Sequence, residues 1–393
     1  MTNEGVSRMN RRDVLRLGGT GAVVVAGARW LTACDPGPPA GSTTTLATTT
    51  TVVPPTTYGP LGATNGHGLR LPAGFTSRVI ATSGYRVPGT EYVWPGDPDG
   101  AATFALPEGG WVYVQNHESY PPFGGVSRIV FAADGTVVGA ERPLGGTTRN
   151  CAGGATPWGT WLSGEEVDTG RIWEVDAFGV NPPAARPAMG VFNHEAAAVH
   201  VATQTIYLTE DKPDGALYRF RPDTYPDLAS GLLEVLTLDG ETVVWAEVPD
   251  PSASSHSTRN QVAGTHRFDG GEGICVLDGV VYFTTKGDNR VWSYSPATNQ
   301  LAVRYDAVAV PMSALSGVDN LTSRASGDLF VAEDGGDMQV VMISGGVAEP
   351  IVQVSGVDGS EMTGVVFDPS GTRMYVTSQR NPGRVYEISG PWV

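Results

Sequence analysis

The sequence predicts an all-β fold, a six-bladed β-propeller, on three observations. Its 393 residues include 52 glycines, 29 prolines, 9 tryptophans and 13 tyrosines, a composition typical of turn-rich β-structure. A unit that opens with a polar residue and leads to a strand recurs six times along the chain. A segment near the N-terminus is suited to pair with the last strand, which would close a ring.

The strand of the repeated unit alternates aromatic and β-branched residues and ends in a second polar pair. The four clearest copies open at Glu195, Glu272, Asp319 and Glu361 and lead to strands at residues 206–211, 281–286, 329–334 and 374–380. Two looser copies open at Asp99 and Cys151 and lead to strands at residues 111–118 and 160–166. Such regular recurrence favours similar sheets arranged around one centre.

The six opening positions are separated by 52, 44, 77, 47 and 42 residues. Blades of four strands span roughly 40–50 residues, so most of these intervals hold one blade. The interval of 77 residues fits a blade with an insertion, which we place in the polar stretch at residues 249–266. Third strands are expected at residues 171–175, 216–220 and 290–294.

The sequence also predicts how the ring closes. The last strand, at residues 384–388, needs an edge partner, and residues 75–80 have the alternating pattern to supply one. Closure of this kind removes free strand edges. A β-sandwich is the alternative all-β fold, but it does not predict a six-fold pattern of this length.

Residues 1–34 are expected to be an export signal. Asn10-Arg11-Arg12-Asp13-Val14-Leu15-Arg16 resembles a twin-arginine signal, and the apolar residues 18–28 are too few to span a bilayer. Leu31-Thr32-Ala33-Cys34 resembles a lipobox, in which Cys34 would carry the lipid. The alternative is a plain cleaved signal with an incidental cysteine.

A tether and the propeller follow this signal. Residues 35–60 are rich in proline and threonine and cannot form a core, so we expect a disordered tether. Residues 61–393 would then form the propeller. This organisation predicts a bacterial lipoprotein exported by the twin-arginine route, at the cell surface or on the periplasmic side. It would be a monomer that is attached to the membrane only through a lipid on Cys34.

The formal net charge of −16 narrows the range of partners. An acidic surface repels nucleic acids and anionic lipid headgroups, so no nucleic-acid partner is expected. The same surface suits divalent cations. The alternative is that the acidity only keeps an exported protein soluble.

If every repeat opens at the same face of the ring, its first polar side chain points to a common centre. The candidates are Cys151, Glu195, Glu272, Asp319 or Asn320, and Glu361. Converging carboxylates repel one another and are stable only with cations among them. Oxygen ligands suit calcium, and a thiolate recruits a softer metal such as iron or zinc, so a mixed cluster is favoured. The alternative is that each polar residue caps a turn.

Several of these residues have a second interpretation. Cys151 can be a ligand or a small buried filler, and a disulfide with Cys275 would remove its thiolate. Cys275 itself lies within a strand and is expected in the core. His194 and His117 precede glutamates and could be ligands, proton donors or hydrogen-bonded scaffold. Arg380 could bind an anion at a metal site or lie on the surface.

At these positions the chain resembles the PhoX-type alkaline phosphatases, a family also described as a secreted group of unknown function. The resemblance covers roughly residues 65–390 and is most specific from Asn150 to Glu166. The matching motifs are Asn150-Cys151-Ala152-Gly153-Gly154, Trp158-Gly159-Thr160-Trp161-Leu162, Glu165-Glu166, Asn193-His194-Glu195-Ala196, Glu210-Asp211, Glu272-Gly273, Asp319-Asn320-Leu321, Glu333-Asp334, Glu361-Met362-Thr363-Gly364 and Gln379-Arg380.

The resemblance implies a six-bladed propeller, twin-arginine export and a phosphatase with iron and calcium ions in its central channel. Cys151 would be the thiolate on iron. The implied carboxylate ligands, with the other candidates, are Glu165, Glu166, Glu195, Glu210, Glu272, Asp319, Glu333, Asp334 and Glu361. His194 and Arg380 are the catalytic candidates, and the substrate would be a small phosphomonoester attacked by an oxygen held on the metal.

Two features depart from the family pattern. The family carries a phosphate-holding arginine two residues before the Glu-Gly pair of the fourth repeat, and Gly270 stands there. The nearest arginine, Arg267, lies three residues before that position. The second departure is that the chain is shorter than the enzymes of the family. We therefore expect Arg380 or Arg267 to replace the arginine. The alternative functions are a calcium-binding propeller that hydrolyses another ester or a lactone, and a non-catalytic binding module.

Overall fold

The computed structural model describes residues 57–357 and 359–392, whose regular secondary structure is almost wholly β-strand. The helical segments among them are three short 3-10 turns, η2 (Pro187–Met189), η3 (Val201–Thr203) and η4 (Thr258–Asn260). No helix in this part of the chain is long and apolar enough to cross a membrane. The described residues all belong to one compact unit. The predicted export signal, Cys34 and residues 35–56 of the predicted tether lie outside the described residues.

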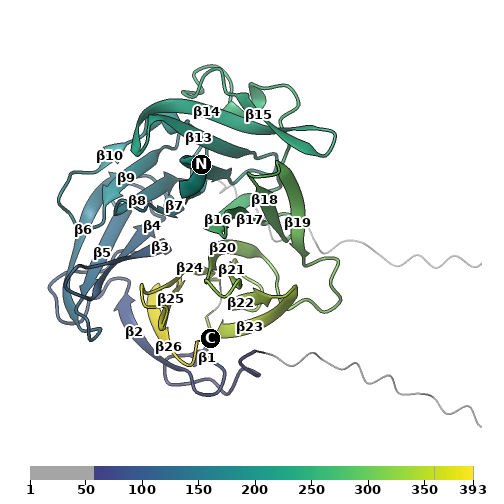
Figure 1. The fold of residues 1–393 in the computed structure, drawn as a ribbon. Helices are drawn as coiled ribbons and strands as arrows, with labels where there is room; N and C mark the ends of the chain where they lie inside the picture. Colours follow the sequence, from purple (N-terminus) through teal and green to yellow (C-terminus); the bar gives the residue numbers. More distant parts are fainter. Residues whose placement is uncertain (1–56, 358, 393) are drawn as a thin grey trace, which may run out of the picture. The chain divides into compact units, whose positions relative to one another are not determined.

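Six strands surround a common centre. They are β3 (Pro98–Ala105), β7 (Asn150–Ala155), β11 (His194–His200), β16 (Gly271–Leu277), β20 (Val318–Ser323) and β24 (Met362–Phe367). Each contacts the next, and β24 contacts β3, so the contacts form a closed cycle (Figure 1). From each inner strand, further strands lead outward in antiparallel order. The all-β fold and the β-propeller architecture are therefore as predicted.

Second and third strands lie where the alternating pattern predicts them. The second strands are β4 (Trp111–His117), β8 (Thr160–Glu165), β12 (Thr205–Glu210), β17 (Val280–Thr285), β21 (Leu329–Glu333) and β25 (Arg373–Ser378). The third strands are β5 (Gly124–Phe131), β9 (Ile172–Asp176), β13 (Leu217–Thr224), β18 (Arg290–Ser295), β22 (Gln339–Ser344) and β26 (Arg384–Ser389). In β17 and β25, buried aromatic and β-branched side chains such as Phe283 and Val376 belong to the hydrophobic core, in keeping with the enrichment of such residues in strands.

The sequence predicts six blades, and backbone pairing groups the described strands into five sheets. The outer strands are β6 (Val137–Thr147), β10 (Ala184–Ala185), β14 (Asp227–Asp239), β15 (Thr242–Glu247), β19 (Gln300–Asp306), β23 (Val347–Val354) and β1 (Leu69–Arg70). One sheet holds nine strands because β11–β15 and β16–β19 are joined through a residue pair, Thr242 with Gln300. The polar stretch predicted as an insertion follows β15 and contains η4.

The predicted closure of the ring is confirmed. Strand β2 (Thr76–Thr82) pairs antiparallel with β26, from Thr76 opposite Ser389 to Thr82 opposite Arg384. An ion pair of 2.7 Å between Arg78 and Glu387 crosses this junction. The N-terminal strand therefore covers the edge of the last sheet, in keeping with the tendency of β-proteins to protect free edges.

Candidate metal centre

A β-bulge near the start of the inner strands turns polar side chains toward the centre. In β3, β7, β11, β16 and β20, ladder pairing is interrupted after the first residue of the strand. The second residues of these strands are Asp99, Cys151, Glu195, Glu272 and Asp319. A bulge leaves a residue unpaired and re-aims its side chain, which is why bulges are common beside active sites.

The sixth repeat differs from the others in the position of its bulge. In β24 the interruption comes after Thr363, so Thr363 occupies the second strand position and remains paired. Glu361 lies just before the strand, in the position that Arg149 and Gly270 hold in their repeats. The residue of the sixth repeat that is equivalent to Glu195 is therefore Thr363. Glu361, which the sequence predicts as the opening residue, lies two residues before it.

A second set of side chains comes from the residue that follows each second strand. These residues are Glu118, Glu166, Asp211, Lys286, Asp334 and Gln379. Each donates its backbone N–H to the carbonyl of the residue before the inner strand of the same repeat; for example, Glu166 donates to Arg149 over 2.9 Å and Lys286 to Gly270 over 2.8 Å. This shared hydrogen bond gives all six residues the same position relative to the centre.

Three groups of ligand atoms form where these two sets meet. They are Asp99, Glu118 and Cys151; Cys151, Glu166 and Glu195; and Glu195, Glu272 and Asp319. Within each group the ligand atoms lie within 4.8 Å of one another. Because Cys151 and Glu195 each belong to two groups, the three form one continuous line of donors. The structure thus brings together five predicted residues: Cys151, Glu166, Glu195, Glu272 and Asp319.

The backbones that carry these ligands are held by the neighbouring repeat. Thr209 Oγ1 donates to the carbonyl of Glu272 over 2.6 Å, and Thr284 Oγ1 donates to that of Asp319 over 2.6 Å. The inner strands also approach closely, since a Cβ at Gly273 would lie 2.3 Å from the backbone nitrogen of Leu321. Glycine after Glu272 therefore permits the packing that sets two ligands side by side.

Three cationic side chains lie among the acidic ones. Arg149 donates to Glu118 Oε1 from Nε over 2.8 Å and to Glu166 Oε2 from Nη2 over 2.5 Å. Arg380 lies 2.9 Å from Glu361 Oε1 and 3.3 Å from Glu118 Oε2.

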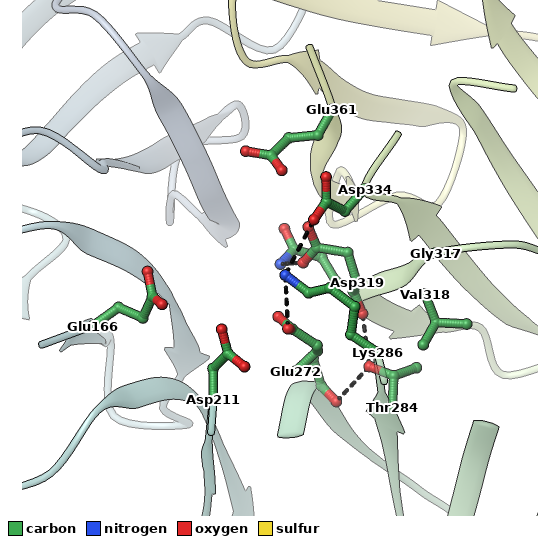
Figure 2. A network of polar contacts seen from close by, with 12 residues as sticks. Glu166, Asp211, Glu272, Thr284, Lys286, Gly317, Val318, Asp319, Asp334 and Glu361 are labelled. Atoms are coloured by element: carbon green, nitrogen blue, oxygen red, sulfur yellow. Dashed lines mark hydrogen bonds and ion pairs between the residues drawn. The ribbon is translucent and has the colours of Figure 1, made fainter. Parts of the chain in front are cut away.

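The third cation, Lys286, lies between two carboxylates (Figure 2). Its ammonium nitrogen is 2.9 Å from Glu272 Oε1 and 3.2 Å from Asp334 Oδ2. Asp334 and Glu361, both predicted as metal ligands, are thus beside the centre as partners of Lys286 and Arg380 and are not members of the three groups.

Burial and mutual repulsion disfavour the ionised forms of the grouped acids. Burial and the nearby Glu118 raise the pKa of Asp99 to about 8. Burial raises the pKa of Glu272 to about 8, although Lys286 opposes the shift. The pKa values of Glu195 and Asp319 are raised well above the usual range by burial and by Glu272. Burial and the surrounding carboxylates also raise the pKa of Cys151. These groups need added positive charge to be ionised together.

The donor atoms fit metal ions. Asp99 Oδ1 and Glu195 Oε1 are buried, and neither has a hydrogen-bond partner among the described residues. Buried carboxylate oxygens are normally paired or bound to a cation, so these atoms indicate an incomplete set of partners. The donors are one sulfur and several carboxylate oxygens, which suits a softer metal at Cys151 and harder cations toward Asp319.

Three further predicted ligands also lie outside the three groups, as Asp334 and Glu361 do. Glu210 Oε2 accepts from the backbone nitrogen of Ala216 and from Tyr218, and its Oε1 contacts Arg259. Glu333 accepts the backbone N–H groups of Ser316 and Gln339 over 2.7 and 3.1 Å. The third, Glu165, likewise accepts the N–H groups of residues 148 and 171 over 3.0 and 3.2 Å. These carboxylates stabilise connecting loops and turn away from the ring centre.

His194 is fully buried against Phe192, with ring centroids 3.6 Å apart, and its Nε2 donates to Gly190 O over 3.0 Å. Burial lowers its pKa to about 3, so the ring is neutral at ordinary pH. A buried, neutral ring that is hydrogen-bonded to the backbone fits the scaffold alternative better than a role as proton donor. Cys151 and Cys275 are both free thiols, so the alternative of a disulfide between them is wrong.

Sequence reasoning missed Asp99 and Glu118 as candidate ligands and Arg149 and Lys286 as the cations beside them. The repeat pattern contained the signal for three of them. Asp99 opens the first repeat as Glu195 opens the third, while Glu118 and Lys286 follow second strands just as Glu166 does. Arg380 and Arg267 are the two arginines expected to replace the phosphate-holding arginine of the family. Of these, Arg380 lies beside the centre. Arg267 instead donates to Asp214 O and Asn260 Oδ1 over 2.9 Å each.

Comparison with known proteins assigns the chain to a family. Among curated proteins, no sequence matches it significantly. Its structure resembles Pseudomonas fluorescens PhoX in complex with vanadate, a transition state analogue, with a TM-score of 0.71 and 16% identity over 84% of this chain and 97% of that one. A protein of unknown function from Bacteroides thetaiotaomicron (TM-score 0.50, 9% identity, 80% and 76% coverage) and a gluconolactonase from Xanthomonas campestris (0.49, 14%, 82% and 90%) are also similar.

At 16% identity the likeness to Pseudomonas fluorescens PhoX concerns the fold alone, and it supports the β-propeller architecture. The sequence profile described as alkaline phosphatase PhoX matches residues 122–383, which is most of the chain and includes Cys151, Glu166, Glu195, Glu272 and Asp319. The chain therefore belongs to the alkaline phosphatase PhoX family.

Proposed function

We propose that this protein is a metal-dependent phosphatase that hydrolyses small phosphomonoesters at the centre of the propeller. The observation that carries the proposal is the continuous line of donors from Glu118 through Cys151 and Glu195 to Asp319, whose ligand atoms lie within 4.8 Å of one another in each group. Membership of the PhoX family supports the same activity. The similarity in fold to a PhoX that binds vanadate supports it as well.

Cys151, Glu166 and Glu195 would hold a softer metal such as iron, and Glu195, Glu272 and Asp319 would hold a calcium ion. When bound, such ions supply positive charge for the phosphoryl oxygens and lower the pKa of water. Arg149 fixes Glu118 and Glu166 through its two contacts. Arg380 is 42% exposed beside the centre, so its guanidinium can face a phosphate that enters from solvent.

We also propose that the ring has six blades, as the repeats predict. The support is the six-fold recurrence of one backbone hydrogen bond, from the residue after each second strand to the residue before the inner strand. Six inner strands in a closed cycle of contacts support the same count. In this view, the nine-stranded sheet consists of two blades whose outer strands meet where Thr242 pairs with Gln300.

We further propose that the protein is exported by the twin-arginine route and anchored through Cys34, with the Thr- and Pro-rich residues as a tether. The support is the order of sequence signals before residue 61. This location would place the phosphatase where external phosphomonoesters reach it. Labelling with a radioactive fatty acid in the native host, with Cys34→Ala as the control, tests the anchor.

The activity is tested on protein purified without chelator. Hydrolysis of p-nitrophenyl phosphate is measured with and without added calcium, and metal content is measured by mass spectrometry. The expected result is turnover that depends on bound metal. Metal-loaded protein that does not hydrolyse p-nitrophenyl phosphate would contradict the proposal.

A second function is favoured by one observation, the absence of a side chain at Gly270, where the sequence resemblance implies a phosphate-holding arginine. A calcium-binding propeller that hydrolyses another ester or a lactone fits that observation. Parallel assays with p-nitrophenyl acetate and a simple γ-lactone discriminate the two. Ester or lactone turnover without phosphatase turnover would favour this alternative, and no turnover with bound calcium would favour a binding module.

A further inference from the structure

Lys286 differs from every residue in the equivalent position of the other repeats. The residues that follow the other second strands are Glu118, Glu166, Asp211, Asp334 and Gln379, all acidic or neutral. The chain has two lysines in all, and the other, Lys212, pairs with the exposed Asp168 over 2.8 Å. A basic residue at this one position therefore indicates a specific role for Lys286 at the centre.

The ammonium of Lys286 is fixed by carboxylates yet accessible. It lies 2.9 Å from Glu272 Oε1 and 3.2 Å from Asp334 Oδ2, and 34% of the side chain is exposed. Figure 2 shows the ammonium next to Asp319, facing the space bordered by Glu166 and Asp211.

Gly270 leaves room for this lysine. The backbone nitrogen of Lys286 donates to Gly270 O over 2.8 Å, so the two residues are neighbours across the repeat. Gly270 has a φ of 71°, and a Cβ there would lie 3.2 Å from Asp211 Oδ1 and 3.5 Å from Lys286 Cβ. A long side chain at residue 270 would therefore compete with Lys286 for the same space.

We propose that Lys286 binds a phosphoryl oxygen of the substrate, an inference that rests on the proposed phosphatase function. An ammonium has three donors, and Glu272 and Asp334 account for two of them. The third can donate to an oxygen of a phosphate in the space beside Asp211. Carboxylates alone repel a phosphate dianion, whereas a fixed ammonium attracts it and contributes a charge-assisted hydrogen bond.

The first test uses the unaltered, metal-loaded protein, so it does not depend on how a variant folds. Lysines are acetylated with acetic anhydride, with and without saturating inorganic phosphate, and the rate at each site is measured by mass spectrometry. We expect phosphate to slow acetylation of Lys286 about tenfold and to leave Lys212 unchanged, because one charge-assisted hydrogen bond is worth about that factor. Equal rates at Lys286 with and without phosphate would overturn the proposal.

The same preparation separates this proposal from the proposed function. Hydrolysis of p-nitrophenyl phosphate without protection of Lys286 would overturn the role of Lys286 and leave the phosphatase in place. Protection of Lys286 without hydrolysis would support a phosphate-binding lysine and overturn the phosphatase.

The second test compares Lys286→Met, Lys286→Arg and the matched control Lys212→Met. Phosphate affinity is measured by calorimetry, together with metal content, kcat and KM. We expect Lys286→Met to weaken phosphate binding by about tenfold to hundredfold and to raise KM, with metal content unchanged. Lys286→Arg should keep most of the affinity because it keeps the charge. Wild-type phosphate affinity in Lys286→Met, or a loss that follows loss of metal, would contradict the proposal.

Discussion

The sulfur of Cys151 and a carboxylate oxygen of Glu195 lie within 4.8 Å of each other, although their strands, β7 and β11, belong to different sheets. Both residues are the second residue of an inner strand, where a bulge turns the side chain toward the centre. The two repeats therefore contribute a soft and a hard donor to one group. This relationship makes the cysteine the most informative residue to change.

Replacing Cys151 with serine should reduce binding of the softer metal by more than about tenfold, since even residues that only support a ligand contribute about that much. Serine retains the size of the side chain but loses the thiolate. Metal content by mass spectrometry and phosphatase turnover should fall together. The matched control is Cys275→Ser, because Cys275 is the other free thiol in the described part of the chain and is not in any of the three groups. Equal metal content in the two variants would show that the thiolate is not a ligand.

Replacing Arg149 with methionine should destabilise the metal-free protein. The change leaves Glu118 and Glu166 without the cation that they share. The expected loss of unfolding free energy is about 1–2 kcal/mol, below the usual cost of breaking a fully buried pair because 31% of the Arg149 side chain is exposed.

Urea denaturation with and without added divalent cation measures the effect of Arg149→Met. Arg149→Lys, which keeps the charge, should lose less stability than the methionine variant. If added cation stabilises Arg149→Met no more than the wild type, the shared ion pair is not linked to the metal groups.

The metal-free protein should lose stability as the pH rises from about 5 to about 9. The folded-state pKa of Glu272 is about 8 and that of Glu361 about 9, both raised first by burial, against 4.5 for an unperturbed glutamate. Between these values the folded state binds more protons than the unfolded state, so raising the pH favours unfolding. Calorimetric melting temperatures across this range measure the slope.

A divalent cation should flatten that pH dependence, because it supplies the charge that lets the carboxylates ionise together. Glu361→Gln should flatten it in part without added metal. A melting temperature of the metal-free protein that does not change between pH 5 and pH 9 would contradict the assignment of strained, buried acids.

Replacing Ile80 with alanine should destabilise the whole ring by about 2–5 kcal/mol, the usual cost for a buried isoleucine. Ile80 is 3% exposed on the closing strand β2 and packs with Tyr375 and Val385 of the last sheet. Val244→Ala, at a residue that is 45% exposed on β15, is the control and should have little effect. Denaturation curves of both variants check the prediction. A small effect at Ile80 would mean that β2 contributes little to closure.

The propeller architecture, the closing strand and much of the centre could be predicted from local sequence patterns alone. Repeats of similar length, each with a polar opening and an alternating strand, are local patterns that survive without knowledge of long-range pairing. For the same reason Cys151, Glu195, Glu272 and Asp319 could be named, since each opens a repeat. Asp99 and Glu118 could have been found by treating the looser first repeat as equal to the others.

The tertiary structure decided which residue of each acidic pair faces the centre. In Glu165-Glu166 and Glu333-Asp334, the first residue ends the second strand and binds loop backbone, and the second lies at the ring. Side chains alternate from one side of a strand to the other, so a shift of one residue exchanges these roles. That phase depends on strand register and on the bulges, which arise from pairing between segments distant in the sequence.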